Sequence, residues 1–147
     1  MGTDENKAII RRQFELLSAG DIPGAARLWA AESFNHGNRV DPAGIAKIYE
    51  SLHTVGETHT LHEMVAEGDW VAVRTTCHGI HRGVPAFPIN SGIFLGIEPS
   101  GREYTVQHLH LFRVTGGKIS EHWANRDDLG AARQIGLELK PGPASSV

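Results

Sequence analysis

A pair of glycines between two alternating stretches is the most constraining feature of this sequence. Gly116 and Gly117 separate residues 104–115 from residues 118–126, and apolar and polar side chains alternate in both stretches. Both central residues of a type I′ turn need positive φ, which glycine adopts readily, so the pattern predicts a β-hairpin. A turn at this pair places Val114 opposite Ile119 and thereby sets the register of the whole hairpin.

One face of this predicted hairpin changes from apolar to polar with distance from the turn. Alternate side chains of a strand share a face. In the predicted register that face consists of His108, His110, Phe112, Val114, Ile119, Glu121, Trp123, Asn125 and Asp127. A hydrophobic core has little reason to gather two histidines, an asparagine and an aspartate around a tryptophan. The pattern therefore predicts the floor of a binding pocket.

Length and composition predict one globular domain over residues 1–140, with a disordered tail at 141–147. The net charge of −3 gives no indication of nucleic acid as a partner. No apolar run is long enough for a membrane span, and the N-terminal residues lack the pattern of a signal peptide. Cys77 is the single cysteine, which predicts no internal disulfide and fits a reducing cytoplasm.

The first part of the chain has helical periodicity. Ile10, Phe14 and Leu17 form an apolar stripe on a predicted helix over residues 4–18. Asp21 can cap a short second helix that includes Leu28 and Trp29, and residues 33–39 read as a loop. The pair Asp41-Pro42 is typical of a helix start and predicts a third helix.

After Gly56 the apolar period changes from helical to two. Residues 58–66 and 70–78 are predicted to form a hairpin in which Glu63 can pair with Arg74. Residues 79–101 are predicted to form a long loop or a bent strand with a lid. A last helix is predicted over residues 129–137. Helices followed by strands indicate the α+β class, with helices covering one face of a curved, mostly antiparallel sheet.

Six segments of the chain together resemble the sequence pattern of a known protein family. They read MVAEGDWVAVR (64–74), GIHRG (79–83), GIEPSGR (96–102), HLFRVTGGKISEHW (110–123), DDLG (127–130) and QIG (134–136). Together they resemble the SnoaL-like polyketide cyclases of the nuclear-transport-factor-2-like (NTF2-like) superfamily, over about residues 5–137. The resemblance implies a cone-shaped α+β barrel in which N-terminal helices pack into a curved sheet.

The resemblance also implies a reaction, because the characterised cyclases close a ring by an intramolecular aldol step without metal or cofactor. They use an acidic residue in the cavity, and Asp127 is the matching carboxylate here. In family members this carboxylate can lie a residue or two earlier, where this chain has His122 and Asn125. The segment at 84–95 is longer than the family pattern, so the shape of the lid and the substrate stay open.

Several residues are candidates for roles in such a cavity. Asp127 can serve as acid and base if an apolar cavity beside Trp123 raises its pKa, or it can simply cap a helix. His108 and His110 can polarise a carbonyl or shuttle a proton, and a metal at this His-x-His pair would need a third ligand such as Asp127 or His36. We expect neither metal nor cofactor. The expected substrate contacts are Asn125, Trp123, Asn35, His36, Trp29, Phe14 and Tyr49.

The leading hypothesis is a cofactor-independent cyclase acting on a hydrophobic, polyketide-like compound of secondary metabolism. Alternatives that keep the same cavity are a pericyclic cyclase, an epoxide hydrolase or isomerase, and a non-catalytic binding module. Epoxide hydrolysis would need an Asp–Arg–Asp-like set, and the predicted register places Arg126 on the wrong face. Leu109 and Leu111 on the outer face predict a homodimer.

Overall fold

The computed structural model describes residues 2–86, 93–138 and 140–142. Its elements in chain order are α1 (Thr3–Ser18), α2 (Ile22–Ala26), β1 (Trp29–Asn35), β2 (Asn38–Val40), α3 (Pro42–Thr54), β3 (Thr58–Glu67), β4 (Trp70–Ile80), β5 (Glu103–Thr115), β6 (Lys118–Arg126) and α4 (Asp128–Gln134). Part of the predicted lid (87–92) and most of the predicted tail (143–147) lie outside the described residues. No described helix is both long and apolar enough to cross a bilayer.

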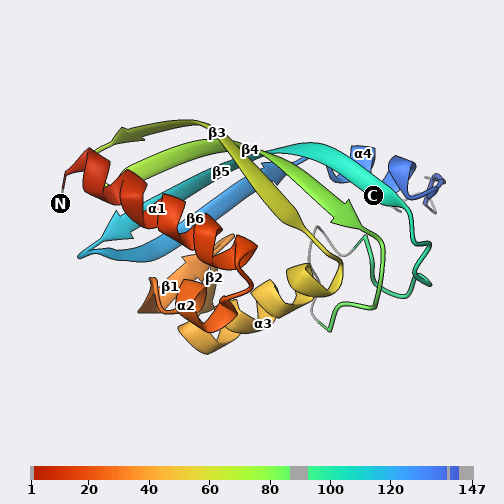
Figure 1. The fold of residues 1–147 in the computed structure, drawn as a ribbon, viewed down its shortest axis with the longest axis horizontal. Coiled ribbons are helices and arrows are strands. Elements are labelled where there is room, and N and C mark those ends of the chain that lie inside the picture. The colour runs from red at the N-terminus through yellow and green to blue at the C-terminus, as the bar shows by residue number, and fades with distance from the viewer. Residues whose placement is uncertain (1, 87–92, 139, 143–147) are drawn as a thin grey trace, which may run out of the picture.

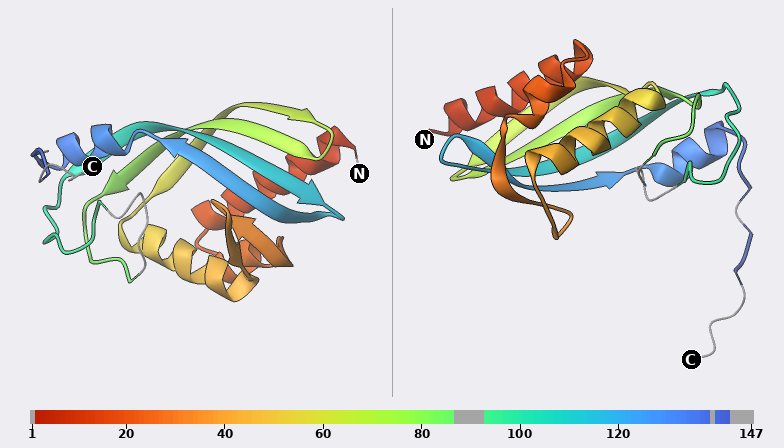
Figure 2. Two further views of the ribbon diagram at one scale, coloured as in Figure 1. Left: turned by 180° about the vertical axis from the view of Figure 1, so that it is seen from behind. Right: turned by 90° about the horizontal axis from the view of Figure 1, so that it is seen from below.

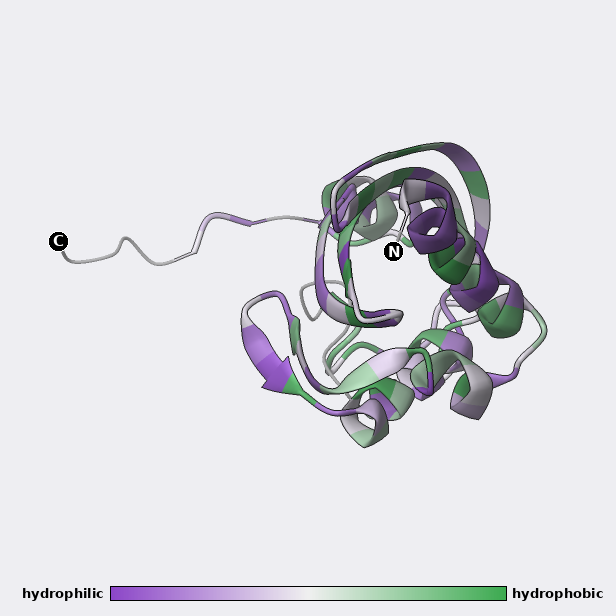
Figure 3. Ribbon diagram, turned by 90° about the vertical axis from the view of Figure 1, so that its left-hand side faces the viewer, coloured by the Kyte–Doolittle hydropathy of each residue, from purple (hydrophilic) through white to green (hydrophobic). Residues whose placement is uncertain are grey.

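The six strands form one curved sheet in the order β2-β1-β6-β5-β4-β3. Neighbouring strands are antiparallel except β1 and β6, which are parallel. Helices α1 and α3 lie across the concave side of the sheet, and α4 lies at the far end of β5 and β6 (Figures 1 and 2). Seen end-on, the sheet curls through a wide arc with the helices along its open side (Figure 3). The predicted α+β cone is confirmed, with an open rather than a closed sheet.

Local sequence signals account for the helices. The side chain of Asp41 accepts a hydrogen bond from Gly44 N at 2.8 Å. Pro42 is the first residue of α3, where proline is tolerated because the backbone N–H that it lacks would have no partner within the helix. Asp21 caps α2 in the same way through Gly24 N. The predicted second helix was too long, because α2 ends at Ala26 and Trp29 is the first residue of β1.

The predicted loop at 33–39 is instead a tight hairpin between β1 and β2. Residues His36 and Gly37 form its turn with φ of 50° and 77°. Positive φ at both central residues is the type I′ geometry that matches the twist of the flanking strands. The hairpin places Asn35 and His36 beside β6, where Asn35 pairs with His122 across the parallel β1–β6 contact.

The two long hairpins form the centre of the sheet. Glu63 and Arg74 form the predicted cross-strand ion pair, with Nε of Arg74 2.7 Å from the carboxylate of Glu63. Glycines with positive φ at 116 and 117 form the predicted turn between β5 and β6, and Val114 pairs with Ile119. Beyond that pair the predicted register is wrong, because Ser120 is an extra residue and Arg113 pairs with Glu121. A one-residue bulge moves the side chain of every later residue in the strand to the opposite face of the sheet.

Two apolar clusters stabilise the fold. The larger cluster joins the helices to the turn end of the sheet and includes the fully buried Ile10, Ala25, Val71 and Ile119. The smaller cluster lies at the opposite end, where Phe94 packs against Tyr104 beneath α4. Neither cluster fills the concave side completely, and a cavity whose apolar walls come mainly from the larger cluster remains there.

Candidate active site

A cavity of about 820 Å³ lies between the concave face of the sheet and helices α1 and α3. Its walls are largely apolar, and they include Phe14, Leu17, Ile22, Trp29, Ile45, Ile48, Leu52 and Phe112. A cavity of this size and character suits a drug-sized hydrophobic molecule. The expected contacts Phe14, Trp29 and Tyr49 all line this cavity.

Six histidines of the described residues line the same cavity, and they come from segments that are distant in sequence. They are His36, His53, His59, His108, His110 and His122. His108 and His110 face inward from β5, as the sequence predicted. His122 also faces inward, because the bulge at Ser120 reverses the faces of β6.

A chain of hydrogen bonds joins Asn35, His122 and His110. The Asn35 Oδ1 lies 2.8 Å from His122 Nδ1, and His122 Nε2 lies 3.0 Å from His110 Nδ1. The amide oxygen can only accept, so His122 donates through Nδ1 and accepts through Nε2. His110 must then carry its proton on Nδ1, and its Nε2 is left with a lone pair. Among the described residues this buried Nε2 has no hydrogen-bond partner.

Three histidines of this cavity, His108, His110 and His122, have pKa values below the ordinary value. Burial, with a smaller contribution from neighbouring His59, lowers the pKa of His108 to about 4. Burial, with a smaller contribution from neighbouring His36, lowers the pKa of His122 to about 3. Burial, followed by repulsion from His122, places the pKa of His110 well below its ordinary value. At neutral pH these imidazoles therefore offer lone pairs rather than positive charges.

A second hydrogen-bonded group faces the cavity from the helices. Trp29 Nε1 donates to Gln13 Oε1 at 2.9 Å and to the hydroxyl oxygen of Tyr49 at 2.8 Å. Because the Tyr49 oxygen accepts from Trp29, its own proton is available for another acceptor. Burial raises the pKa of Tyr49, so the hydroxyl stays neutral and can act as a donor.

Arg126 brings a positive charge to the cavity wall. Its Nε lies 3.3 Å from Asp128 Oδ1, and its Nη1 lies 3.5 Å from His36 Nε2. The expectation that Arg126 lies on the wrong face is corrected by the bulge in β6. Among the described residues, the carboxylates that line the cavity are Asp41 and Glu57.

The same bulge removes two expected residues from the cavity. Trp123 is 41% exposed on the outer face, where it pairs with Leu111 and donates to Glu121 Oε1 at 2.7 Å. Asn125 is exposed on that face opposite Leu109. Neither side chain lines the cavity, so their expected positions on its floor are wrong.

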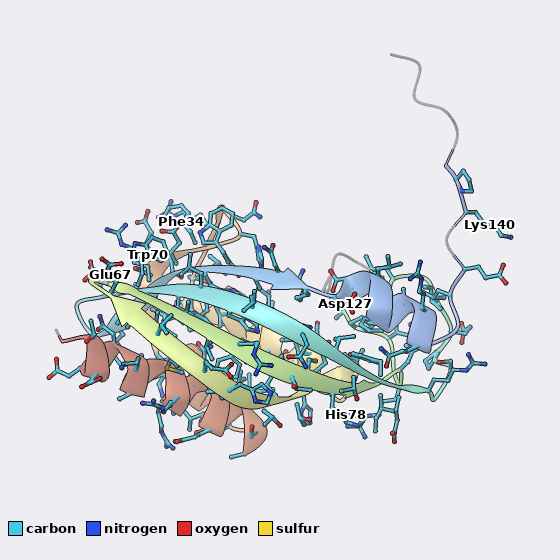
Figure 4. The ribbon with its side chains drawn as sticks, turned by 90° about the horizontal axis from the view of Figure 1, so that it is seen from above. Phe34, Glu67, Trp70, His78, Asp127 and Lys140 are labelled. Atoms are coloured by element: carbon cyan, nitrogen blue, oxygen red, sulfur yellow. The ribbon has the colours of Figure 1, made fainter. Side chains whose placement is uncertain are left out.

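Asp127 also lies elsewhere than expected. It is the N-cap of α4, where its Oδ1 accepts from Gly130 N at 2.8 Å, and its side chain is exposed. Figure 4 shows Asp127 at the junction of β6 and α4, at one end of the sheet. The helix-cap alternative therefore describes its structural position, and the expected position on the cavity floor is corrected.

Sequence reasoning missed His59, His122 and Glu57 as cavity residues. One signal could have identified His122. Without a bulge, Glu121 would be buried beside Phe112, whereas with a bulge it pairs with Arg113 on the outer face. A carboxylate opposite an arginine is more stable than one buried beside phenylalanine, so the charge pattern favours the bulged register.

The fold and the cavity define a class of protein, the cone-shaped α+β proteins with a largely apolar cavity on the concave side of the sheet. Within that class the chain matches the SnoaL-like polyketide cyclase family over residues 7–135. The match covers most of the chain, so this protein belongs to the SnoaL-like polyketide cyclase family, and the expected enzyme class is confirmed.

Curated relatives support this family. The chain is 27% identical over 137 residues to the aklanonic acid methyl ester cyclase DnrD of Streptomyces peucetius, covering 87% of this chain and 88% of the relative. It is 28% identical over 107 residues to the nogalonic acid methyl ester cyclase of Streptomyces nogalater, covering 71% of this chain and 73% of the relative.

Solved structures have the same fold. TsrD from Streptomyces laurentii superposes with a TM-score of 0.76 at 23% identity, covering 94% of this chain and 99% of the other. IdmH from Streptomyces antibioticus, described as a putative polyketide cyclase, superposes with a TM-score of 0.70 at 25% identity, covering 90% of this chain and 99% of the other.

Proposed function

We propose that this chain closes a ring in a hydrophobic, polyketide-like ester by an intramolecular aldol reaction, with His110 as proton acceptor and without a cofactor. The observation that carries the proposal is the chain from Asn35 through His122 to His110, which ends in an unpartnered Nε2 in an apolar cavity. Two relatives are named for methyl esters of aklanonic and nogalonic acid, so esters of this kind are the first substrates to test.

The reaction needs a base and a hydrogen-bond donor, and His110 and Tyr49 can serve in these roles. His110 Nε2 removes a proton from the carbon next to a carbonyl, and the resulting enolate carbon attacks a second carbonyl of the same molecule. The new carbon–carbon bond leaves an alkoxide on the second carbonyl. The Tyr49 hydroxyl donates a hydrogen bond to that oxygen, and the proton on His110 returns to neutralise it.

A low pKa of His110 is compatible with this role. The resting imidazole is neutral and its lone pair is available at neutral pH. Proton transfer creates an imidazolium and an enolate together, so each charge compensates the other in the apolar cavity. The cavity also holds the two reacting ends of the substrate close together, which supplies a large part of the rate gain.

Replacement of His110 by phenylalanine tests the proposal. The His110→Phe variant keeps a ring that can stack against Phe112 and His122 but has no nitrogen. We expect kcat for ring closure of aklanonic acid methyl ester to fall by about 10²–10⁴, as for loss of a positioned base. His62→Phe is the matched control, because His62 is exposed on β3 and should leave turnover unchanged. Equal turnover by His110→Phe and wild type would contradict the proposal.

A further inference from the structure

Three of the cavity histidines face one another at close range. His59 lies on β3 and His108 and His110 on β5, and one possible ligand atom from each lies within 4.8 Å of the other two. The ring centroids are 5.3 Å apart for His59 and His108, 5.6 Å for His108 and His110, and 5.7 Å for His59 and His110. The three rings therefore form a nearly equilateral triangle.

These spacings match those of a tetrahedral metal site. An ion bound to imidazole nitrogens at about 2.0–2.1 Å holds the ring centroids about 5.2 Å apart. The observed rings are within about half an ångström of that arrangement. Small rotations of the side chains would thus bring one nitrogen of each ring to bonding distance of a common ion.

Strand β4 creates the space for this triangle. Thr75 of β4 pairs with His108 on β5 and with Leu61 on β3, so it lies diagonally opposite His59, the partner of Cys77. Its side chain is small, so the two larger rings can meet above it. The Thr75 Oγ1 also lies 3.2 Å from His59 Nδ1, a contact that can hold the ring and leave Nε2 for an ion.

Two unpartnered nitrogens indicate that this cluster receives a ligand. Among the described residues, buried His108 Nδ1 and His110 Nε2 have no hydrogen-bond partner. A buried polar atom without a partner is costly, and histidine side chains in a core are normally satisfied. The second nitrogen of His110 is held by His122, which is the arrangement typical of metal-bound histidine.

The surrounding charge favours a dication. The Glu57 carboxylate is 2% exposed, and its Oε2 lies 3.9 Å from His59 Nε2. Arg126 contributes positive charge to the same cavity, but Asp128 pairs with it. Three imidazoles with a carboxylate nearby suit Zn²⁺ and related divalent transition metals.

We infer that His59, His108 and His110 form a binding site for a divalent transition metal of the zinc type. The fourth coordination position faces the cavity and can hold water or an oxygen of a bound molecule. This site goes beyond the proposed cyclase function. It also competes with that function, because the ion and the substrate proton need the same lone pair on His110 Nε2.

Equilibrium dialysis with Zn²⁺ tests the site directly. The purified chain is first stripped with a chelator, and we expect it to bind one zinc ion per chain. Alanine at His59 or His110 should weaken zinc binding at least tenfold. His62→Ala is the control, because exposed His62 lies on the same strand but bonds to Thr76 on the outer face, and this variant should bind as wild type does. Cobalt bound in place of zinc should give the visible absorption of a tetrahedral ion.

Two outcomes would overturn the inference, namely no saturable binding by the wild type or equal binding by wild type and His59→Ala. Circular dichroism confirms that each variant is folded, and His59→Ala alone suffices if His110→Ala does not fold. Turnover is measured separately. Zinc binding that leaves ring closure unaffected would support the metal site and contradict the role of His110 as base, so zinc binding and turnover together show which of the two proposals fails.

Discussion

Nδ1 of His110 lies 3.0 Å from Nε2 of His122, and one extra residue in β6 makes this contact possible. Ser120 bulges out of the pairing between β5 and β6, so His122 faces the cavity and Trp123 faces outward. Without the bulge, Trp123 would lie beside His110 and His122 would be outside. The proposed base therefore depends on a backbone irregularity ten residues further along the chain.

Asn35 should act as a positioning residue for His110. In the Asn35→Leu variant, His122 Nδ1 loses its acceptor, so either tautomer of His122 becomes possible. When His122 carries its proton on Nε2, it donates to His110 Nδ1, and the proton of His110 moves to its Nε2 in place of the lone pair. An unsatisfied buried hydrogen bond costs about 1–3 kcal/mol, and we expect kcat to fall at least tenfold with little change in KM. Asn35→Asp retains the acceptor and should keep kcat within a few-fold of wild type. Steady-state kinetics that show equal losses for both variants would contradict the positioning role.

Asp127→Asn should retain near-wild-type turnover. Asparagine caps helices about as well as aspartate, so the bond to Gly130 N should persist and the unfolding free energy should change by less than about 0.5 kcal/mol. Asp127→Ala should cost about 1 kcal/mol of stability by loss of the cap, measured by urea denaturation. A large fall in kcat for Asp127→Asn would instead restore the carboxylate as the catalytic acid.

Stability should fall as the pH falls, and His81 should contribute to this dependence. His81 is buried at 1% exposure, its Nδ1 accepts from Ser100 N at 3.2 Å, and its ring packs beside Phe94. Burial lowers the pKa of His81 below its ordinary value. Between the lowered pKa and about 6.5, the unfolded chain binds more protons than the folded chain, so acid favours unfolding.

The His81→Asn variant isolates this contribution. Asparagine offers an acceptor to Ser100 N but does not titrate. The free energy of unfolding, from urea denaturation at pH 7.5 and pH 5, should decline less in the variant than in the wild type. The other buried histidines contribute equally to both chains and cancel in the difference. Identical declines would contradict the prediction for His81.

The outer face of the sheet should form a homodimer interface. Leu109 is 58% exposed and Leu111 is 39% exposed beside the outward-facing Trp123, which makes a contiguous apolar strip on β5 and β6. We expect a dimer in sedimentation velocity at micromolar concentration, and Leu109→Lys should shift it to monomer. Leu129→Lys is the control, because Leu129 is also exposed but lies on α4. A wild type that sediments as a monomer would contradict the prediction.

Local signals predicted most of the fold. Asp41-Pro42 begins α3, and the glycine pair at 116 and 117 turns the hairpin, because both depend only on neighbouring residues. The bulge at Ser120 has no such local signal, and a one-residue error moved Trp123 and Asn125 to the wrong face. His59 joins the site only through the pairing of β3, β4 and β5, which the periodicity of one strand cannot show.

Deuterium exchange tests the role of His110 most directly. The substrate for this measurement is an ester of the aklanonic acid type in which the second carbonyl is removed, so that it can enolise but cannot close a ring. We expect wild type to exchange the proton next to the remaining carbonyl for deuterium, and His110→Phe to slow this exchange by at least a hundredfold. Wild type that closes the ring of the natural ester but exchanges no proton would contradict the account and favour a pericyclic closure.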